Sequence, residues 1–163
     1  MVNPKDAVIS QYRAALEMLK LAVNNCPDSL WNDPGYANKF WHIAYHTLFY
    51  AHLYLQVTGG DFKPWHLHRD QYHRLDHGED MPGVLEPYTK DEILSYIEFC
   101  DQEMQDKMPL LDLKAESSGF SWLPFGKLEL QIYNIRHIQH HTAELMERLG
   151  EDANISIDWV GKK

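Results

Sequence analysis

The sequence predicts an all-α fold, and three observations support that prediction. Four stretches of about twenty residues each repeat apolar side chains at helical spacing. Capping and breaking residues stand at the ends of these stretches. The 163 residues contain no internal repeat and no low-complexity linker, which predicts a single domain over 1–163. Four helices of this length are typical of a four-helix bundle, followed here by a short tail over 150–163.

The first helix is predicted from Pro4 to Asn25. Asn3 is a good N-cap residue, and Pro4 occupies the first helical position, where its missing N–H is not needed. Pro27 ends the helix, and a turn-rich stretch follows over 28–35. One apolar stripe runs along this helix, made of Val8, Tyr12, Ala15, Leu16, Leu19 and Val23.

The second helix is predicted from Tyr36 or Ala37 to Thr58, and a glycine pair at 59–60 stops it. A long loop over 61–88 comes next, with several prolines and histidines. Its extended reach exceeds the length of a helix, so the chain can return along the whole bundle before the third helix begins. The second and third helices can then run parallel, which gives the order up-down-down-up.

The third helix is predicted to begin at Thr89, where Thr89 and Glu92 have the spacing of a capping box, and to end or kink at Pro109. The fourth is predicted from Gly126 or Lys127 to Leu149, with Gly150 as its C-cap residue. Within the tail, the stretch 155–160 is expected to dock in an extended conformation.

Composition and charge exclude several classes of partner. The formal net charge is −9, which disfavours nucleic acid and anionic membrane surfaces, because both require concentrated basic residues. The N-terminus does not look like a signal peptide, and no stretch has the length of an uncharged membrane span. Cys26 and Cys100 do not suggest a disulfide framework. We therefore expect a cytoplasmic protein.

Ten histidines is a high count for this length, and two of them have the spacing of metal ligands. His137 and His141 are four residues apart, one turn from each other on one face of the fourth helix. Such a pair is by itself more often an ordinary feature of a surface or core. Here its line along the helix falls mostly on the buried stripe, and a shared metal ion would satisfy two buried imidazoles. His140 is rotated away from His141 by about 100°.

A third ligand is expected on the second helix. His46 lies on or beside the apolar face of that helix, and His42, one turn earlier, is the competing candidate. Spacing favours His46 and leaves both open. His52 is rotated away, towards solvent or the loop. Imidazole is a ligand for zinc, nickel, copper and iron alike, so the metal is predicted only as a divalent ion.

Other metal and catalytic motifs are missing from the sequence. No glutamate is followed three residues later by a histidine, which removes the di-iron carboxylate pattern of helical bundles. The chain also lacks the His-Glu-x-x-His motif of zinc proteases, a glycine-rich phosphate loop and the Gly-x-Ser-x-Gly motif.

The segments Phe40-Trp41-His42-Ile43-Ala44-Tyr45-His46-Thr47-Leu48 and Asn134-Ile135-Arg136-His137-Ile138-Gln139-His140-His141 resemble the DinB/YfiT-like family of metal-binding four-helix bundles. The resemblance extends from the first helix to about Gly150. It implies an up-down-down-up bundle, often dimeric. It also implies one zinc, nickel, iron or manganese ion held by His46, His137 and His141, and Trp41 matches a tryptophan common in the family.

The resemblance implies two kinds of enzyme: S-transferases that use a low-molecular-weight thiol, and metal-dependent hydrolases. Three histidines leave coordination positions open for water or substrate, which favours a metal-dependent enzyme acting on a small molecule. The alternative is a non-catalytic metal-binding or stress-response module.

Glu129 and Tyr133 are candidates for supporting residues, although a solvated helix face for Glu129 and the core for Tyr133 are favoured. The loop histidines resemble a metal-rich tract, but a solvated loop is favoured over a second metal site: His66, His68, His73 and His77. This loop could also cover the pocket, with Trp65 and Trp122 packed there.

Overall fold

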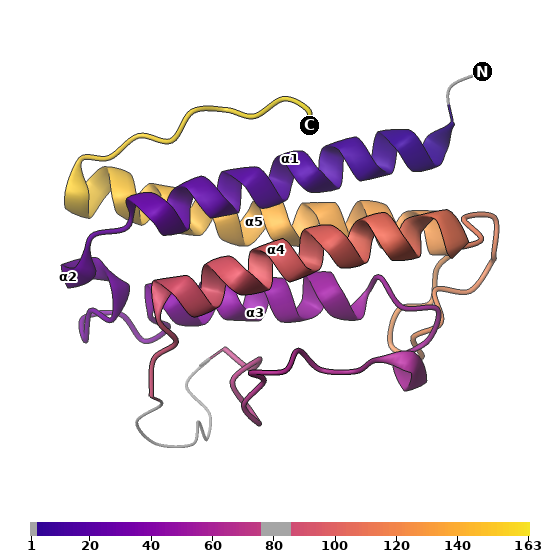
Figure 1. Ribbon diagram of the computed structural model, residues 1–163, viewed down its shortest axis with the longest axis horizontal. Coiled ribbons are helices and arrows are strands. Elements are labelled where there is room, and N and C mark those ends of the chain that lie inside the picture. Colours follow the sequence, from indigo (N-terminus) through magenta and orange to yellow (C-terminus); the bar gives the residue numbers. More distant parts are fainter. Residues whose placement is uncertain (1–2, 76–85) are drawn as a thin grey trace.

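The fold of the chain is known from a computed structural model that describes residues 3–75 and 86–163 (Figure 1). The described residues form five α-helices and two short 3₁₀ turns, and they contain no strand. The prediction of an all-α chain is therefore confirmed for these residues. None of their helices is long and apolar enough to cross a membrane.

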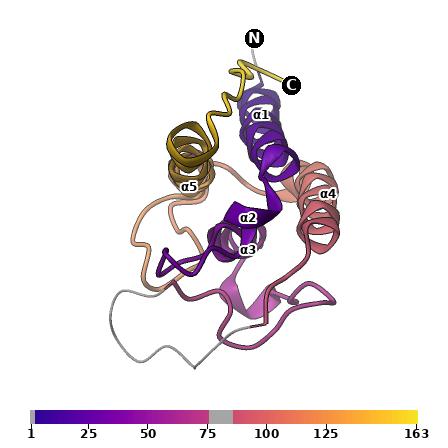
Figure 2. The same cartoon turned by 90° about the vertical axis from the view of Figure 1, so that its left-hand side faces the viewer.

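Four long helices lie side by side: α1 (Pro4–Asn25), α3 (Phe40–Leu53), α4 (Lys90–Lys107) and α5 (Lys127–Ala153). α1 and α3 each pack against both α4 and α5. The end-on view in Figure 2 shows the four helices around a common centre. In Figure 1, α1 and α5 run in one direction, and α3 and α4 run in the other.

The helix starts follow the local sequence closely. The Asn3 side chain accepts a hydrogen bond from the Lys5 N–H and caps α1. At the start of α4, Thr89 and Glu92 form both hydrogen bonds of the predicted capping box. The 3₁₀ turn Met108–Leu110 contains the predicted helix-ending proline and follows α4 directly.

α3 is shorter than predicted at both ends. It begins at Phe40 rather than at 36 or 37, and a four-residue helix, α2 (Asp28–Trp31), lies in the stretch predicted as turns. At its other end it stops at Leu53 rather than at Thr58. The 3₁₀ turn Gly59–Asp61 follows after a bent segment.

Polar side chains of α5 explain the early end of α3. Asn134 donates to the Ala51 carbonyl at 3.0 Å, and Gln131 donates to the Tyr54 carbonyl at 2.9 Å. One turn further towards the start of α5, the buried Lys127 Nζ donates to carbonyls of Gln56, Val57 and Ser118. Because these side chains satisfy the carbonyl groups, the chain can leave the helix without stranding them.

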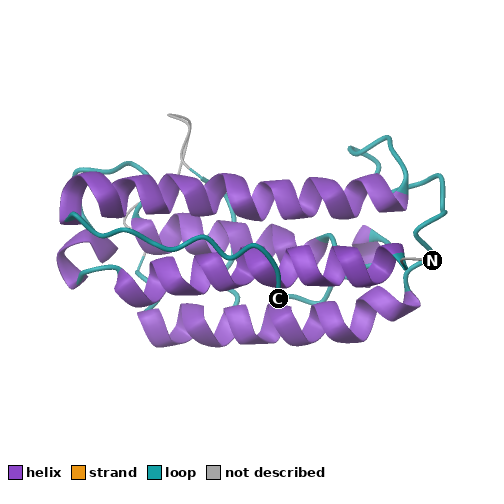
Figure 3. Ribbon diagram, turned by 90° about the horizontal axis from the view of Figure 1, so that it is seen from above, coloured by secondary structure: helices purple, strands orange, loops and turns teal. Residues whose placement is uncertain are grey.

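The end of α5 was predicted wrongly. The helix continues through Gly150 and ends at Ala153, and Asn154 adopts the left-handed conformation with φ 55°. Asparagine tolerates this conformation better than most residues, so it terminates the helix in place of the expected glycine. The tail then returns beside α1 (Figures 1 and 3), where Gln11 donates to the Gly161 carbonyl at 3.0 Å.

The segment before the undescribed residues covers α3 with aromatic rings. Trp65 is buried and stacks on Tyr96 of α4, with ring centroids 4.4 Å apart. Tyr45 of α3 stacks on Tyr88 at 4.6 Å and contacts His68 by a 2.6 Å hydrogen bond. This cover places the chain around His73 against the middle of α3.

Candidate metal centre

Three histidine side chains from two helices meet between α3 and α5. One ring nitrogen of each of His46, His137 and His141 lies within 4.8 Å of the other two. The Nε2 atoms of His46 and His137 are 3.3 Å apart. The structure therefore brings together the three residues that the sequence predicts as ligands, in a group that could hold a metal ion.

A backbone carbonyl orients His46. The Nδ1–H of this ring donates a 2.7 Å hydrogen bond to the His73 carbonyl, which comes from the segment covering α3. With its proton on Nδ1, the neutral ring presents the lone pair of Nε2 to the other two histidines. A carbonyl that fixes the tautomer in this way is the usual companion of a metal-bound histidine.

A carboxylate orients His141. Its Nδ1–H donates to Oε2 of Glu144 at 2.6 Å, one turn further along α5. This pairing also directs the Nε2 lone pair away from the carboxylate and raises the basicity of the ring. Sequence reasoning did not single out Glu144, although its position three residues after His141 places both on one helix face.

The surroundings of His137 fit a shared cation. Its Nε2 faces Nε2 of His46, whereas its buried Nδ1 has no hydrogen-bond partner among the described residues, so Nε2 is the nitrogen available to an ion shared with His46. Two nitrogens bound to one tetrahedral zinc at about 2.0–2.1 Å lie about 3.3–3.4 Å apart. The 3.3 Å separation of the His46 and His137 Nε2 atoms matches that spacing.

Burial keeps the three rings in the form that binds metals. It lowers the pKa of His46 to about 3 and that of His137 to about 2, with smaller contributions from the neighbouring histidines. Burial also lowers the pKa of His141, against the opposing effect of Glu144. Neutral imidazoles offer lone pairs without first losing a proton, so all three are ready ligands at neutral pH.

The competing candidate on α3 has a different environment. His42 is buried, stacks on Trp41 with ring centroids 5.0 Å apart, and shares a 2.9 Å hydrogen bond between its Nε2 and the Tyr72 carbonyl. Sequence spacing left His42 and His46 open. Of the two, only His46 lies in the group with the α5 histidines.

The remaining histidines do not gather into a second loop site. His66 is exposed, His68 contacts Tyr45, and His73 stacks on Phe49 at 4.4 Å between centroids. None of them belongs to a potential ligand cluster in the described part of the chain, and His77 lies outside the described residues. Among the residues that the structure describes, the exposed His140 falls in one further potential ligand group, with His141 and Glu144.

The candidates for supporting residues and the two tryptophans expected over the site lie apart from the three histidines or pack against other side chains. Glu129 is exposed on α5, and Tyr133 packs edge-on against the ring of Tyr54. Trp65 is buried, whereas Trp122 is 57% exposed and packs edge-on against Phe120. Among the described residues, the supporting groups that hydrogen-bond to the three histidines are Glu144 and the His73 carbonyl, rather than Glu129 or Tyr133.

His52 was predicted to interact with solvent or the loop, and its contact with the loop is confirmed. Its side chain is only 3% exposed, and its ring contacts Phe62 of the loop together with Tyr96 and Phe99 of α4. The ring therefore lies on the α3–α4 side of the bundle, away from the α5 histidines. Burial and the nearby Lys107 lower its pKa to about 4.

We expect His52→Gln to weaken the pH dependence of stability. An unfolded histidine binds its proton near about pH 6.5, whereas the folded ring binds it only near about pH 4. His52 therefore leaves the free energy of unfolding undiminished above about pH 6.5, and it lowers that free energy increasingly as the pH falls towards about 4. Urea unfolding of the metal-free proteins measures the free energy of unfolding at about pH 7.5 and at about pH 5. Between these pH values it should fall by about 1–2 kcal/mol less in the variant than in the unchanged protein. Equal losses in both proteins would contradict this expectation.

Comparisons with protein-family models, with curated proteins and with solved structures gave no significant match to this chain, so the resemblance to the DinB/YfiT-like family stays a prediction.

Proposed function

We propose that the chain binds one divalent metal ion through His46, His137 and His141 and acts as a metal-dependent enzyme on a small molecule. The single observation that supports this proposal best is the convergence of three neutral imidazoles within 4.8 Å. Two of them are already oriented, by the His73 carbonyl and by Glu144.

The proposal includes the fold type and the reaction class. Helices α1, α3, α4 and α5 would form an up-down-down-up four-helix bundle of the DinB/YfiT-like kind, which the helix directions in Figure 1 support. The reactions would be those the resemblance implies: transfer to a low-molecular-weight thiol, or hydrolysis. A dimeric state belongs to the same proposal.

Three histidine ligands are the pattern of catalytic rather than closed structural metal sites. When bound, such an ion lowers the pKa of a coordinated water or thiol and supplies a nucleophile near neutral pH. The residues of this chain would hold the ion and fix the ring tautomers. Glu144 would accept a hydrogen bond from the Nδ1–H of His141. This bond would hold the proton on Nδ1, leave the Nε2 lone pair for the ion and keep the ring aligned.

Elemental analysis of protein purified without chelator tests the site. We expect about one equivalent of metal in the unchanged protein, and a large loss in His46→Ala, because two histidines alone bind a divalent ion weakly. His140→Ala is the matched control on α5, since His140 is exposed beside the pair. His42→Ala is the control on α3, and both controls should keep the metal. Loss of metal in His42→Ala with retention in His46→Ala would overturn the assignment.

A non-catalytic metal-binding module is the second candidate. The cover over His46 favours it, since the His73 segment contacts that ring and His141 is only 8% exposed. Water proton relaxation on manganese-loaded protein separates the two candidates. Exchangeable water on the ion would support the enzyme, and its complete exclusion would support the module.

A further inference from the structure

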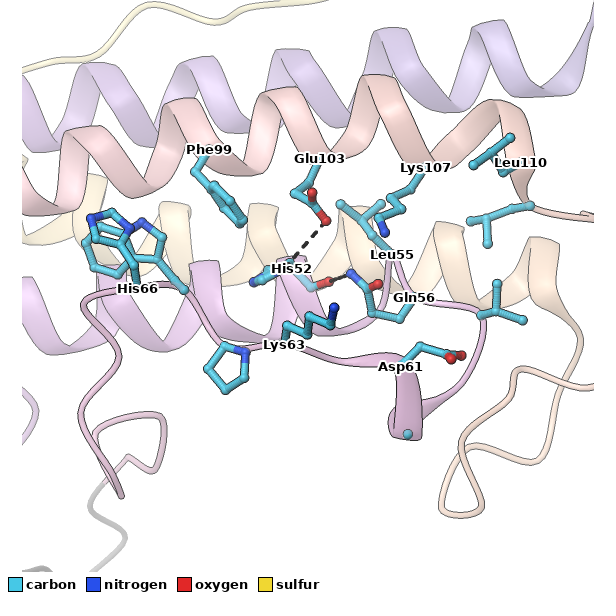
Figure 4. Close-up of a pocket in the computed structure, with 15 residues that line it drawn as sticks. His52, Leu55, Gln56, Asp61, Lys63, His66, Phe99, Glu103, Lys107 and Leu110 are labelled. Carbon is cyan, nitrogen blue, oxygen red and sulfur yellow. Dashed lines mark hydrogen bonds and ion pairs between the residues drawn. The ribbon is translucent and has the colours of Figure 1, made fainter.

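A large cavity lies on the opposite side of α3 from the three histidines. It measures about 780 Å³ and opens between the end of α3, the segment over 55–66 and the second half of α4 (Figure 4). None of His46, His137 and His141 lines it. This volume falls in the range of small-molecule sites, which are concave, mostly apolar and furnished with a few polar groups.

The cavity has an apolar wall and a buried polar floor. Leu55, Trp65 and Leu111 are buried residues that line it, and Phe99 adds the edge of an aromatic ring. His52 lies at the floor and is 2% exposed. A ligand with an apolar or aromatic body would displace water from this wall, which favours binding.

Two lysines face the cavity, and one of them, Lys107, lies near enough to Asp61 to help lower the pKa of that carboxyl. Figure 4 shows Lys107 extending from α4 and Lys63 extending from the opposite segment towards the same space. Within residues 3–75 and 86–163, neither ammonium group has a hydrogen bond or ion pair, whereas Lys20, Lys90 and Lys163 all do. Unpaired cations that converge on a concave site are unusual in a chain of net charge −9 and suit an anionic ligand.

Two carboxylates, Asp61 and Glu103, also line the cavity. Oδ2 of Asp61 accepts hydrogen bonds from the backbone N–H and the hydroxyl of Thr58, at 2.9 and 2.7 Å. Oε2 of Glu103 lies 3.7 Å from Nε2 of His52, too far for a hydrogen bond, and burial keeps that ring neutral at neutral pH. Among the described charged side chains of the lining, the two ammonium groups are the ones with neither a hydrogen bond nor an ion pair, and they are the groups that suit an anionic ligand.

We infer that this cavity binds a small organic acid, with a carboxylate between Lys63 and Lys107 and an apolar body against Phe99 and Trp65. The metal is not needed for this binding, because the ligating histidines lie on another face of α3. A hydroxyl or amide on the acid could reach the gap between His52 and Glu103. The cavity would then supply either a substrate-holding or a regulatory site separate from the metal.

Three compounds with the same aromatic body test the charge preference: phenylacetate, phenethylamine and 2-phenylethanol. Titration of the metal-free, isotope-labelled protein by NMR at neutral pH gives both affinity and location. We expect phenylacetate to bind at least about tenfold more tightly than the other two, the effect of one or two charge-assisted hydrogen bonds. Its shifts should gather at Lys63, Phe99 and Lys107.

Matched lysine variants test the two proposed contacts. Lys63→Met combined with Lys107→Met should weaken phenylacetate binding by about tenfold or more. Lys114→Met is the control, since Lys114 is exposed outside the cavity and should leave the affinity unchanged. His46→Ala should also bind phenylacetate normally, so a failure of the metal proposal does not affect this test.

Three outcomes would overturn the inference: no binding of phenylacetate at millimolar concentration, tighter binding of phenethylamine, or shifts located away from the cavity. Equal binding by the double lysine variant, with a folded spectrum, would also contradict the assigned contacts.

Discussion

Replacing His137 by leucine should abolish stabilisation by zinc while leaving the metal-free protein at least as stable as the unchanged chain. A ligand that binds only the folded state stabilises it by about 2.7 kcal/mol at a concentration one hundred times its Kd. The variant loses one of three ligands and therefore this stabilisation. In the metal-free state it also loses a buried Nδ1 that has no partner among the described residues. Removing an unsatisfied buried polar atom offsets the cost of a changed side chain.

The opposite responses of the two states distinguish a ligand from a core residue. Urea unfolding with a chelator and with excess zinc measures both, and His140→Leu is the control because that side chain is exposed on the same helix. The control should keep the full zinc effect. If His137→Leu lost stability with the chelator present and kept the zinc effect, His137 would be a packing residue and the metal site would need another ligand.

Local signals explain why the starts of α1 and α4 were predicted well. Asn3 and the pair Thr89 and Glu92 act within one turn of their helices, so their hydrogen bonds depend on sequence alone. The end of α3 depends on another part of the fold. α3 ends where side chains of α5 reach its carbonyl groups, and a single-sequence pattern does not show which carbonyls those are.

A sequence signal for that contact was nevertheless present. Lys127, Gln131 and Asn134 are polar residues spaced at helical intervals along the inner face of a stretch predicted to be helical, and all three are buried. Buried polar residues at such intervals require partners on a neighbouring element. The broken end of a nearby helix is a natural source of free carbonyl groups.

Part of the candidate site also follows from local sequence, and part depends on how the helices pack. The spacing of His137 and His141 places them on one helix face, and that relation follows from helical geometry. His42 and His46 also share a face, four residues apart, so periodicity does not separate them. Which of the two histidines meets the α5 pair depends on how far along α3 each one lies relative to α5, and packing sets that position. The His73 carbonyl that holds His46 is a backbone group from a loop, to which side-chain patterns give no clue.

Replacing Lys127 by methionine should have the largest effect on stability of any single change at the α3–α5 contact. Its ammonium group donates to carbonyls of Gln56 and Val57, at 3.3 and 2.8 Å, and to that of Ser118. Methionine has nearly the same reach and no donor, so the carbonyls lose their partner. Each unsatisfied buried acceptor costs about 1–3 kcal/mol, and relief from burying a charge offsets part of the sum. We expect a net loss of about 3 kcal/mol in the free energy of unfolding.

Lys114→Met is the matched control and should change stability by less than about 0.5 kcal/mol, because Lys114 is exposed. Hydrogen exchange should locate the loss. Gly119 sits so close to Val57 that an added Cβ would lie 2.0 Å from the Val57 carbonyl oxygen, so the two segments joined by Lys127 have almost no space between them. Their amide protons should exchange faster in Lys127→Met through local opening, whereas those in the middle of α1 and α4 should speed up only as much as the loss of global stability requires. A loss below about 1 kcal/mol with unchanged exchange would mean that water replaces the ammonium group and that Lys127 does not hold the end of α3.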